Sequence, residues 1–160
     1  MWRGAPAHGR GTRLALCSTA AVMPPRETWQ QRIEAVLSGG MESIVDVVVA
    51  RWFTQPFIEG EPEKVDRVRA MLLATPPAGY AGCCAAIRDM DQRASISGIS
   101  RPTLVVAGAA DPATPPERGE EIAAAIRGAE LEVIPACAHL SNIEQTDRFN
   151  ARVIPFLTGS

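Results

Sequence analysis

Two side chains in the second half of the sequence have the types and surroundings for acid–base chemistry. Asp111 follows a glycine and two alanines and precedes a proline, and His139 lies among small residues in the segment 136–140. A histidine that accepts a proton near neutral pH needs a carboxylate on its other ring nitrogen, which holds the tautomer and stabilises the imidazolium. We therefore expect Asp111 and His139 to be the acid and the base of a catalytic group.

Each of these residues also has an ordinary structural interpretation. Aspartates in loops rich in glycine and proline commonly form turns or cap helices, and His139 could be a partly exposed loop histidine. The residue types alone leave both interpretations open. What favours catalysis is that one carboxylate and one imidazole occur in two consecutive loops of the predicted fold.

Strand and helix patterns alternate around these two loops. Short apolar runs at 103–107 and 131–134 are typical of buried strands, and the residues between them carry the apolar face of a helix that Gly128 ends. Strands joined through a helix run parallel, and ligands bind at the carboxyl ends of such strands. The Asp111 and His139 loops both lie at that edge of the predicted sheet.

Hydroxyl residues mark three predicted helix starts. Thr75 and Thr114 each precede prolines, and Ser141 precedes Glu144 by three residues, so all three suit the N-cap position. The helix opened by Ser141 would run to the end of the chain.

Upstream, apolar residues recur at helical spacing in successive segments, which predicts four short helices. Their apolar positions include Trp29, Ile33, Val36 and Leu37, then Ile44, Val47, Val48 and Trp52, then Val65, Val68 and Leu72.

These patterns predict an α/β fold with a short parallel sheet and an inserted four-helix cap. Residues 1–24 contain an irregular start, 1–11, and a first core strand at 12–18. Residues 25–93 form the helical cap, or lid. Residues 94–160 form the C-terminal α/β core, which carries the acid and histidine loops.

The composition excludes several classes of function. With 46% hydrophobic and 21% charged residues and a net charge of −2, the chain has a globular balance and no basic stripe for nucleic acid or an anionic membrane. No stretch approaches the ~20 apolar residues of a membrane span. The apolar run after Arg13 imitates a signal peptide, but Ser18 and Thr19 interrupt it and a buried strand explains it. We expect a cytoplasmic protein.

The cysteines predict neither a disulfide framework nor a metal site. They lie at 17, 83, 84 and 137, two of them adjacent, and no C-x-x-C occurs. The two histidines are too scattered to complete a zinc site, although Cys137 and His139 form a local pair. We expect no metal, and we interpret Cys83 and Cys84 as small packing residues.

Four stretches carry a resemblance to a known family. They are Leu14–Ala21, Ala50–Thr54, Gly79–Asp89 and Ala138–Glu144. These stretches resemble the bacterial 3-oxoadipate enol-lactonases of the α/β-hydrolase fold, and the second and third are the more particular to that family. The resemblance extends over most of the chain and corresponds to the C-terminal part of the fold.

The resemblance implies a Ser-His-Asp triad with Asp111 as its acid and His139 as its base. In that fold the serine comes first in the chain, on a G-x-S-x-G turn between a strand and a helix. This sequence contains no G-x-S-x-G, and its oxyanion-hole loop is not visible. We therefore expect a truncated chain that lacks the nucleophile.

The implied reaction is hydrolysis of 3-oxoadipate enol-lactone to 3-oxoadipate, in the β-ketoadipate pathway of aromatic catabolism, without a cofactor. The partner would be a small-molecule lactone rather than nucleic acid or membrane. A substrate carboxylate favours a cationic contact, which makes Arg51 beside Trp52 the candidate substrate-binding pair. A solvated arginine and a tryptophan on the apolar helix face explain the same two residues.

Three interpretations of the missing nucleophile remain open. The chain could be a truncated product or a wrongly started reading frame of an enzyme gene. It could be an inactive remnant or binding module that kept the lid and two triad residues. It could also be one part of a hydrolase assembled with a separate N-terminal half. Another carboxylic ester hydrolase of the same fold is an alternative to the enol-lactonase.

Overall fold

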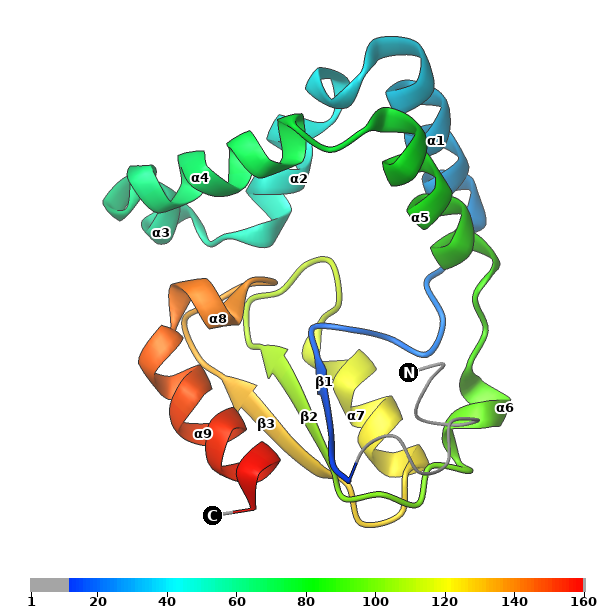
Figure 1. Cartoon of the computed structure of the whole chain (residues 1–160), viewed down its shortest axis with the longest axis vertical. Coiled ribbons are helices and arrows are strands. Elements are labelled where there is room, and N and C mark those ends of the chain that lie inside the picture. Colours follow the sequence, from blue (N-terminus) through cyan, green and yellow to red (C-terminus); the bar gives the residue numbers. More distant parts are fainter. Residues whose placement is uncertain (1–11, 160) are drawn as a thin grey trace. The chain divides into compact units, whose positions relative to one another are not determined.

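The computed structural model describes residues 12–159, which fall into two compact units (Figure 1). The first, here called the core unit, contains the described residues up to Ala21 and those from Gln92 onward. The second, the helical unit, is Val22–Asp91. The segment 1–11, predicted to be irregular, lies outside the described residues.

A three-stranded parallel sheet forms the centre of the core unit. Its strands are β1 (Leu14–Cys17), β2 (Thr103–Gly108) and β3 (Glu130–Ile134), in the order β1-β2-β3. Leu16 is opposite Val105, and Ala107 is opposite Val133. Every residue of β2 is buried, as expected for a central parallel strand covered on both faces. The predicted short parallel sheet is confirmed.

Helices cover the two faces of this sheet (Figure 1). On one face, Leu16 and Val105 form an apolar cluster with Ile122 of α7 (Pro116–Ala125). On the other face, Leu104 and Val106 pack with Phe156 of α9 (Thr146–Thr158). The short helices α6 (Arg93–Ile96) and α8 (Ser141–Glu144) complete this unit. Successive β2 side chains thus anchor opposite helices and hold the carboxyl end of the strand in place.

The helical unit consists of α1 (Arg26–Gly39), the 3-10 helix η1 (Met41–Ser43), α2 (Val45–Trp52), α3 (Gln55–Gly60), α4 (Pro62–Leu73) and α5 (Pro77–Asp89). Helix α1 packs along α5, and α2 and α3 pack on α4. Between residues 26 and 89 there are thus five α-helices, where four were predicted. The sequence pattern missed α3 because its six residues are too few for a helical period.

The predicted apolar faces of these helices were only partly right. Val65, Val68 and Leu72 of α4 are all buried, whereas Leu37 and Val47 are 60% and 63% exposed. No single described helix is long and apolar enough to span a membrane. Helices α4 and α5 meet that test only as a pair, which is bent by 94°.

All three predicted hydroxyl caps were wrong. Helix α5 begins at Pro77 after Pro76, and α7 begins at Pro116 after Pro115. Neither helix has a side-chain cap at its N-terminus. Thr75 instead donates to the Met71 carbonyl oxygen, 3.0 Å away. Ser141 is the first residue of α8, which ends at Glu144, so the C-terminal segment is two helices rather than one.

Candidate active site

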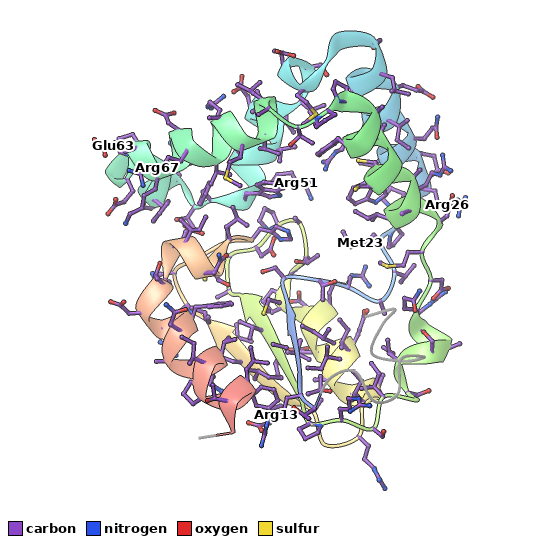
Figure 2. All side chains as sticks on the ribbon, viewed as in Figure 1. Arg13, Met23, Arg26, Arg51, Glu63 and Arg67 are labelled. Carbon is purple, nitrogen blue, oxygen red and sulfur yellow. The ribbon has the colours of Figure 1, made fainter. Side chains whose placement is uncertain are left out.

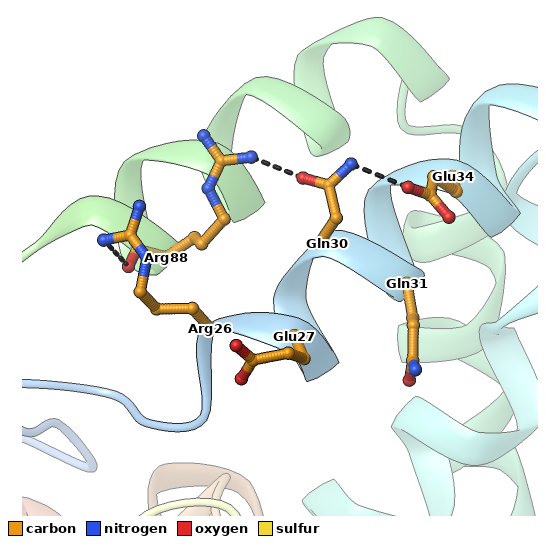
Figure 3. Close-up of a pocket in the computed structure, with 6 residues that line it drawn as sticks. All are labelled: Arg26, Glu27, Gln30, Gln31, Glu34 and Arg88. Carbon is orange, nitrogen blue, oxygen red and sulfur yellow. Dashed lines mark hydrogen bonds between the residues drawn. The ribbon is translucent and has the colours of Figure 1, made fainter.

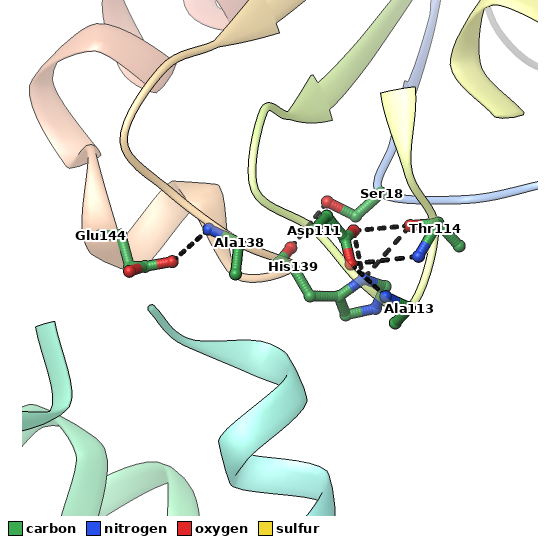
Figure 4. Close-up of polar contacts among 7 residues, drawn as sticks. All are labelled: Ser18, Asp111, Ala113, Thr114, Ala138, His139 and Glu144. Carbon is green, nitrogen blue, oxygen red and sulfur yellow. Dashed lines mark hydrogen bonds and ion pairs between the residues drawn. The ribbon is translucent and has the colours of Figure 1, made fainter. Parts of the chain in front are cut away.

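Asp111 lies in the loop that follows β2, and its carboxylate is fully enclosed. Its side chain is 0% exposed. The backbone N–H groups of Ala113 and Thr114 donate to Oδ1 at 2.7 and 3.0 Å. These bonds give Asp111 the turn-forming role that the sequence also allowed, and they leave Oδ2 directed at the neighbouring loop (Figure 4).

His139 lies in the loop that follows β3, with its imidazole against this carboxylate. The distance from Nδ1 to Asp111 Oδ2 is 2.8 Å, and the His139 side chain is 21% exposed. An ionised carboxylate only accepts hydrogen bonds, so we assign the proton to Nδ1, which makes Nε2 the basic nitrogen. The two residues that the sequence paired from adjacent loops are therefore in hydrogen-bond contact.

Thr114 is a third member of this cluster. Its hydroxyl donates to Asp111 Oδ2 at 2.7 Å and lies 3.3 Å from His139 Nδ1. The sequence pattern assigned Thr114 to a helix cap, and the hydroxyl is instead engaged by the carboxylate. Thr114 is 3% exposed, so its hydroxyl needs a partner inside the fold.

The hydrogen bonds keep Asp111 ionised despite its burial. Burial is the largest single influence and raises the pKa of Asp111, but the hydrogen bonds from His139 and Thr114 and the charge interaction with His139 together outweigh it. The net pKa of Asp111 is below its ordinary value. At neutral pH the site therefore presents a buried negative charge to the imidazole, which is the condition for stabilising an imidazolium.

Close backbone contact brings the two loops together. Ala109 N–H donates to the Ile134 carbonyl oxygen and Ala110 N–H to that of Cys137, both at 2.9 Å. This approach requires Gly108, since a Cβ there would lie 2.1 Å from the Ala138 carbonyl oxygen. Nothing local in the sequence distinguishes Gly108 from other loop glycines.

The sequence that forms this site matches that of a known protein family. Residues 1–152 match the Alpha/beta hydrolase family. The chain belongs to this alpha/beta hydrolase family. Relatives in the family agree in fold as well as in sequence. The enol-lactonase from Burkholderia xenovorans LB400 superposes with a TM-score of 0.94 at 38% identity, over 98% of this chain and 60% of that one.

Other relatives extend the similarity. A hydrolase from Pseudomonas aeruginosa PA01 is 43% identical with a TM-score of 0.92, over 98% of this chain and 59% of that one. In sequence, 3-oxoadipate enol-lactonase 2 of Acinetobacter baylyi is 38% identical over 90% of this chain and 54% of its own length. This alpha/beta hydrolase chain thus spans about half the length of the curated relatives it matches.

Arg51 and Trp52 are the last two residues of α2 in the helical unit. Arg51 is labelled in Figure 2. Both side chains are half-buried. A cation in the last turn of a helix interacts favourably with the helix dipole, which is a structural role for Arg51. The structure brings Asp111 and His139 together within the core unit and places the predicted substrate-binding pair in the other unit.

Cys137 lies in the histidine loop, two residues before His139, and is a structural thiol. It is fully buried, and its Sγ donates to the Ile134 carbonyl oxygen at 3.3 Å. Burial, with a contribution from the Glu144 carboxylate, raises the pKa of Cys137 to about 11. The thiol is therefore protonated at neutral pH. Within residues 12–159, no group of three or more His, Cys, Asp or Glu side chains could hold a metal ion.

A polar depression on the helical unit contains neither acid–base residue (Figure 3). It is lined by Arg26, Glu27, Gln30, Gln31, Glu34 and Arg88. Its groups bond to one another: Arg88 Nη1 donates to Gln30 Oε1 at 2.5 Å, and Gln30 Nε2 donates to Glu34 Oε1 at 2.8 Å. These hydrogen bonds give the polar side chains that line the depression a structural role within the helical unit.

Proposed function

We propose that this chain supplies the acid and base of an alpha/beta hydrolase that opens small enol-lactones. The observation that carries the proposal is the 2.8 Å contact between His139 Nδ1 and Asp111 Oδ2, with the carboxylate ionised and the imidazole partly exposed. Similarity to the enol-lactonases of Burkholderia xenovorans and Acinetobacter baylyi supports 3-oxoadipate enol-lactone as the substrate. That substrate would place the protein in cytoplasmic aromatic catabolism.

In this proposal His139 transfers protons at Nε2. It takes the proton of a serine hydroxyl as the serine oxygen attacks the ring carbonyl carbon, and it gives that proton to the enol oxygen as the ring C–O bond breaks. It then deprotonates the water that attacks the acyl carbon, and it returns that proton to the serine oxygen as the acyl–serine C–O bond breaks. The enol released in the first step converts to the ketone of the 3-oxo acid. The ionised Asp111 stabilises the imidazolium in both half-reactions.

The nucleophile in this proposal comes from a segment outside these 160 residues. The sequence has no G-x-S-x-G turn. Ser18 directly follows β1, but its hydroxyl donates to the His139 carbonyl oxygen at 2.6 Å. It therefore contacts the backbone of the histidine loop, and an irregular segment follows it rather than the helix that a nucleophile turn requires.

The helical unit would act as the lid over the substrate. Arg51 would bind a substrate carboxylate, and Trp52 would cover the apolar part of the ring. Arginine suits this task because its planar guanidinium binds a carboxylate through two parallel hydrogen bonds.

Complementation with the missing segment tests the proposal. We expect the purified chain to show no enol-lactone turnover alone. Co-expression with the part of the Burkholderia xenovorans enol-lactonase that this chain does not cover should produce turnover. In the complemented protein, Arg51→Leu should raise KM for the lactone more than it lowers kcat.

His139→Ala in the complemented protein is the matched control, since it removes the base and leaves the partner segment intact. Turnover that survives His139→Ala would refute the assignment of the base. An assembled pair with no turnover on lactones or simple esters would instead favour an inactive remnant or binding module. Turnover of simple esters alone would favour another carboxylic ester hydrolase of the family.

A further inference from the structure

Two side chains from outside the loop, Ser18 and Glu144, hold the backbone on which the His139 imidazole is mounted. Main-chain bonds to the Asp111 loop hold this segment only as far as Cys137. Beyond it, the Ala138 N–H donates to Glu144 Oε2 at 2.5 Å, and the His139 carbonyl oxygen accepts from Ser18 Oγ at 2.6 Å. These two contacts lie on either side of the His139 Cα (Figure 4).

The conformation of Ser18 indicates what its side chain is for. Its φ is +45°, in the left-handed region that favours glycine and costs other residues roughly 1–2 kcal/mol. Glycine would adopt this backbone without strain but could not donate a hydrogen bond. A serine at such a position points to a use for the hydroxyl, and this hydroxyl donates to the carbonyl oxygen of His139.

Glu144 provides the opposite anchor from α8, the helix that follows the loop. Its carboxylate accepts from the Ala138 N–H, and Ala138 is 1% exposed. A charged acceptor makes this hydrogen bond stronger than a neutral one. The capping-box pattern assigned Glu144 to the start of its own helix, whereas its carboxylate reaches back to the loop before that helix.

We infer that Ser18 and Glu144 are positioning residues that hold the His139 backbone where Nδ1 bonds to Asp111. The inference rests on the proposed role of His139 as the base. Removing either anchor loosens the backbone at Ala138 and His139, so the imidazole more often samples orientations in which Nδ1 leaves the carboxylate. The imidazole then loses its preference for one tautomer.

Nitrogen-15 NMR of the imidazole tests this in the 160-residue chain and needs no turnover. The chain has only two histidines, and a His8→Gln background leaves His139 as the single signal. We expect Ser18→Ala and Ser18→Gly alike to shift the ring nitrogens towards a tautomer mixture. The Nδ1 proton should exchange with water roughly threefold to tenfold faster, as for the loss of one hydrogen bond.

The pair of Ser18 variants separates positioning from a purely structural role. If Ser18 only supports the turn, Ser18→Gly suits the positive φ and leaves the His139 signals unchanged, which would overturn the inference for Ser18.

A second pair of variants tests Glu144. Glu144→Ala should shift the His139 signals, and Glu144→Gln should retain them because its amide oxygen still accepts the hydrogen bond. Unchanged signals in Glu144→Ala would overturn the inference for Glu144. Circular dichroism verifies that each variant is folded.

Failure of this experiment is distinguishable from failure of the proposed function. The NMR signals report the geometry of His139 whether or not any lactone is hydrolysed. Loss of turnover in the complemented protein with intact His139 signals would count against the proposed function alone.

Discussion

At the scale of single residues, the buried charge of Asp111 dominates the site. Its pKa in the folded chain is below the value of about 3.9 expected in the unfolded chain. Since a lowered pKa favours folding wherever the carboxyl is ionised, Asp111 contributes its full stability above about pH 4. That contribution is lost as the pH falls through the folded-state pKa.

Asp111→Asn should therefore change how stability depends on pH. At pH 7 we expect the variant to be less stable by roughly 1.5–3 kcal/mol, the usual value for hydrogen bonds to a charged group. Between pH 5 and pH 2 its stability should fall less steeply than that of the parent chain. Urea unfolding across this range measures both effects. Parallel pH profiles for the two proteins would show that Asp111 carries no such linkage.

At the scale of elements, Gly108 at the end of β2 determines how closely the acid and histidine loops approach. A Cβ at this position would meet backbone atoms of both Cys137 and Ala138, which cannot move aside as a flexible side chain could. Gly108→Ala should thus force the loops apart. We expect the free energy of unfolding to fall by about 1–3 kcal/mol, as for other overpacked sites. The His139 ring should also shift towards a mixture of tautomers.

Gly82→Ala is the matched control for this variant. Gly82 lies inside α5, and nothing is within 4 Å of the position a Cβ would take. Alanine is the better helix former, so this change should stabilise the chain by roughly 0.5–1 kcal/mol. Equal effects of the two substitutions would contradict the close approach at Gly108.

The elements also separate what local sequence can predict from what it cannot. The three strands follow from their apolar runs and the α4 face from helical periodicity, although only β2 is buried along its whole length and β3 is buried only at Ile134. The Asp111 and His139 loops follow from the rule for parallel sheets. The hydroxyl caps failed because the helices begin at Pro77, Pro116 and Ser141, so that none of the three hydroxyl residues stands at the N-cap. The contact of Ser18 with His139 joins residues 121 apart in the sequence, and no local pattern contains it.

At the scale of the whole molecule, the outer edge of β1 is a backbone edge on which another strand could pair. Among residues 12–159, β1 pairs with β2 on one side only. Leu14 N–H donates to Pro102 and Ser18 N–H to Val106, so the alternate amides of Ala15 and Cys17 face the other side. An open strand edge of this kind promotes pairing with another chain.

Hydrogen exchange of these amides tests whether that edge is open in the purified chain. We expect the amides of Ala15 and Cys17 to exchange at least about tenfold faster than those of Leu104 and Val106 in the central strand. The same two amides should become protected when the chain is co-expressed with the N-terminal part of a relative. Strong protection of both amides in dilute, monomeric chain would contradict an open edge at β1.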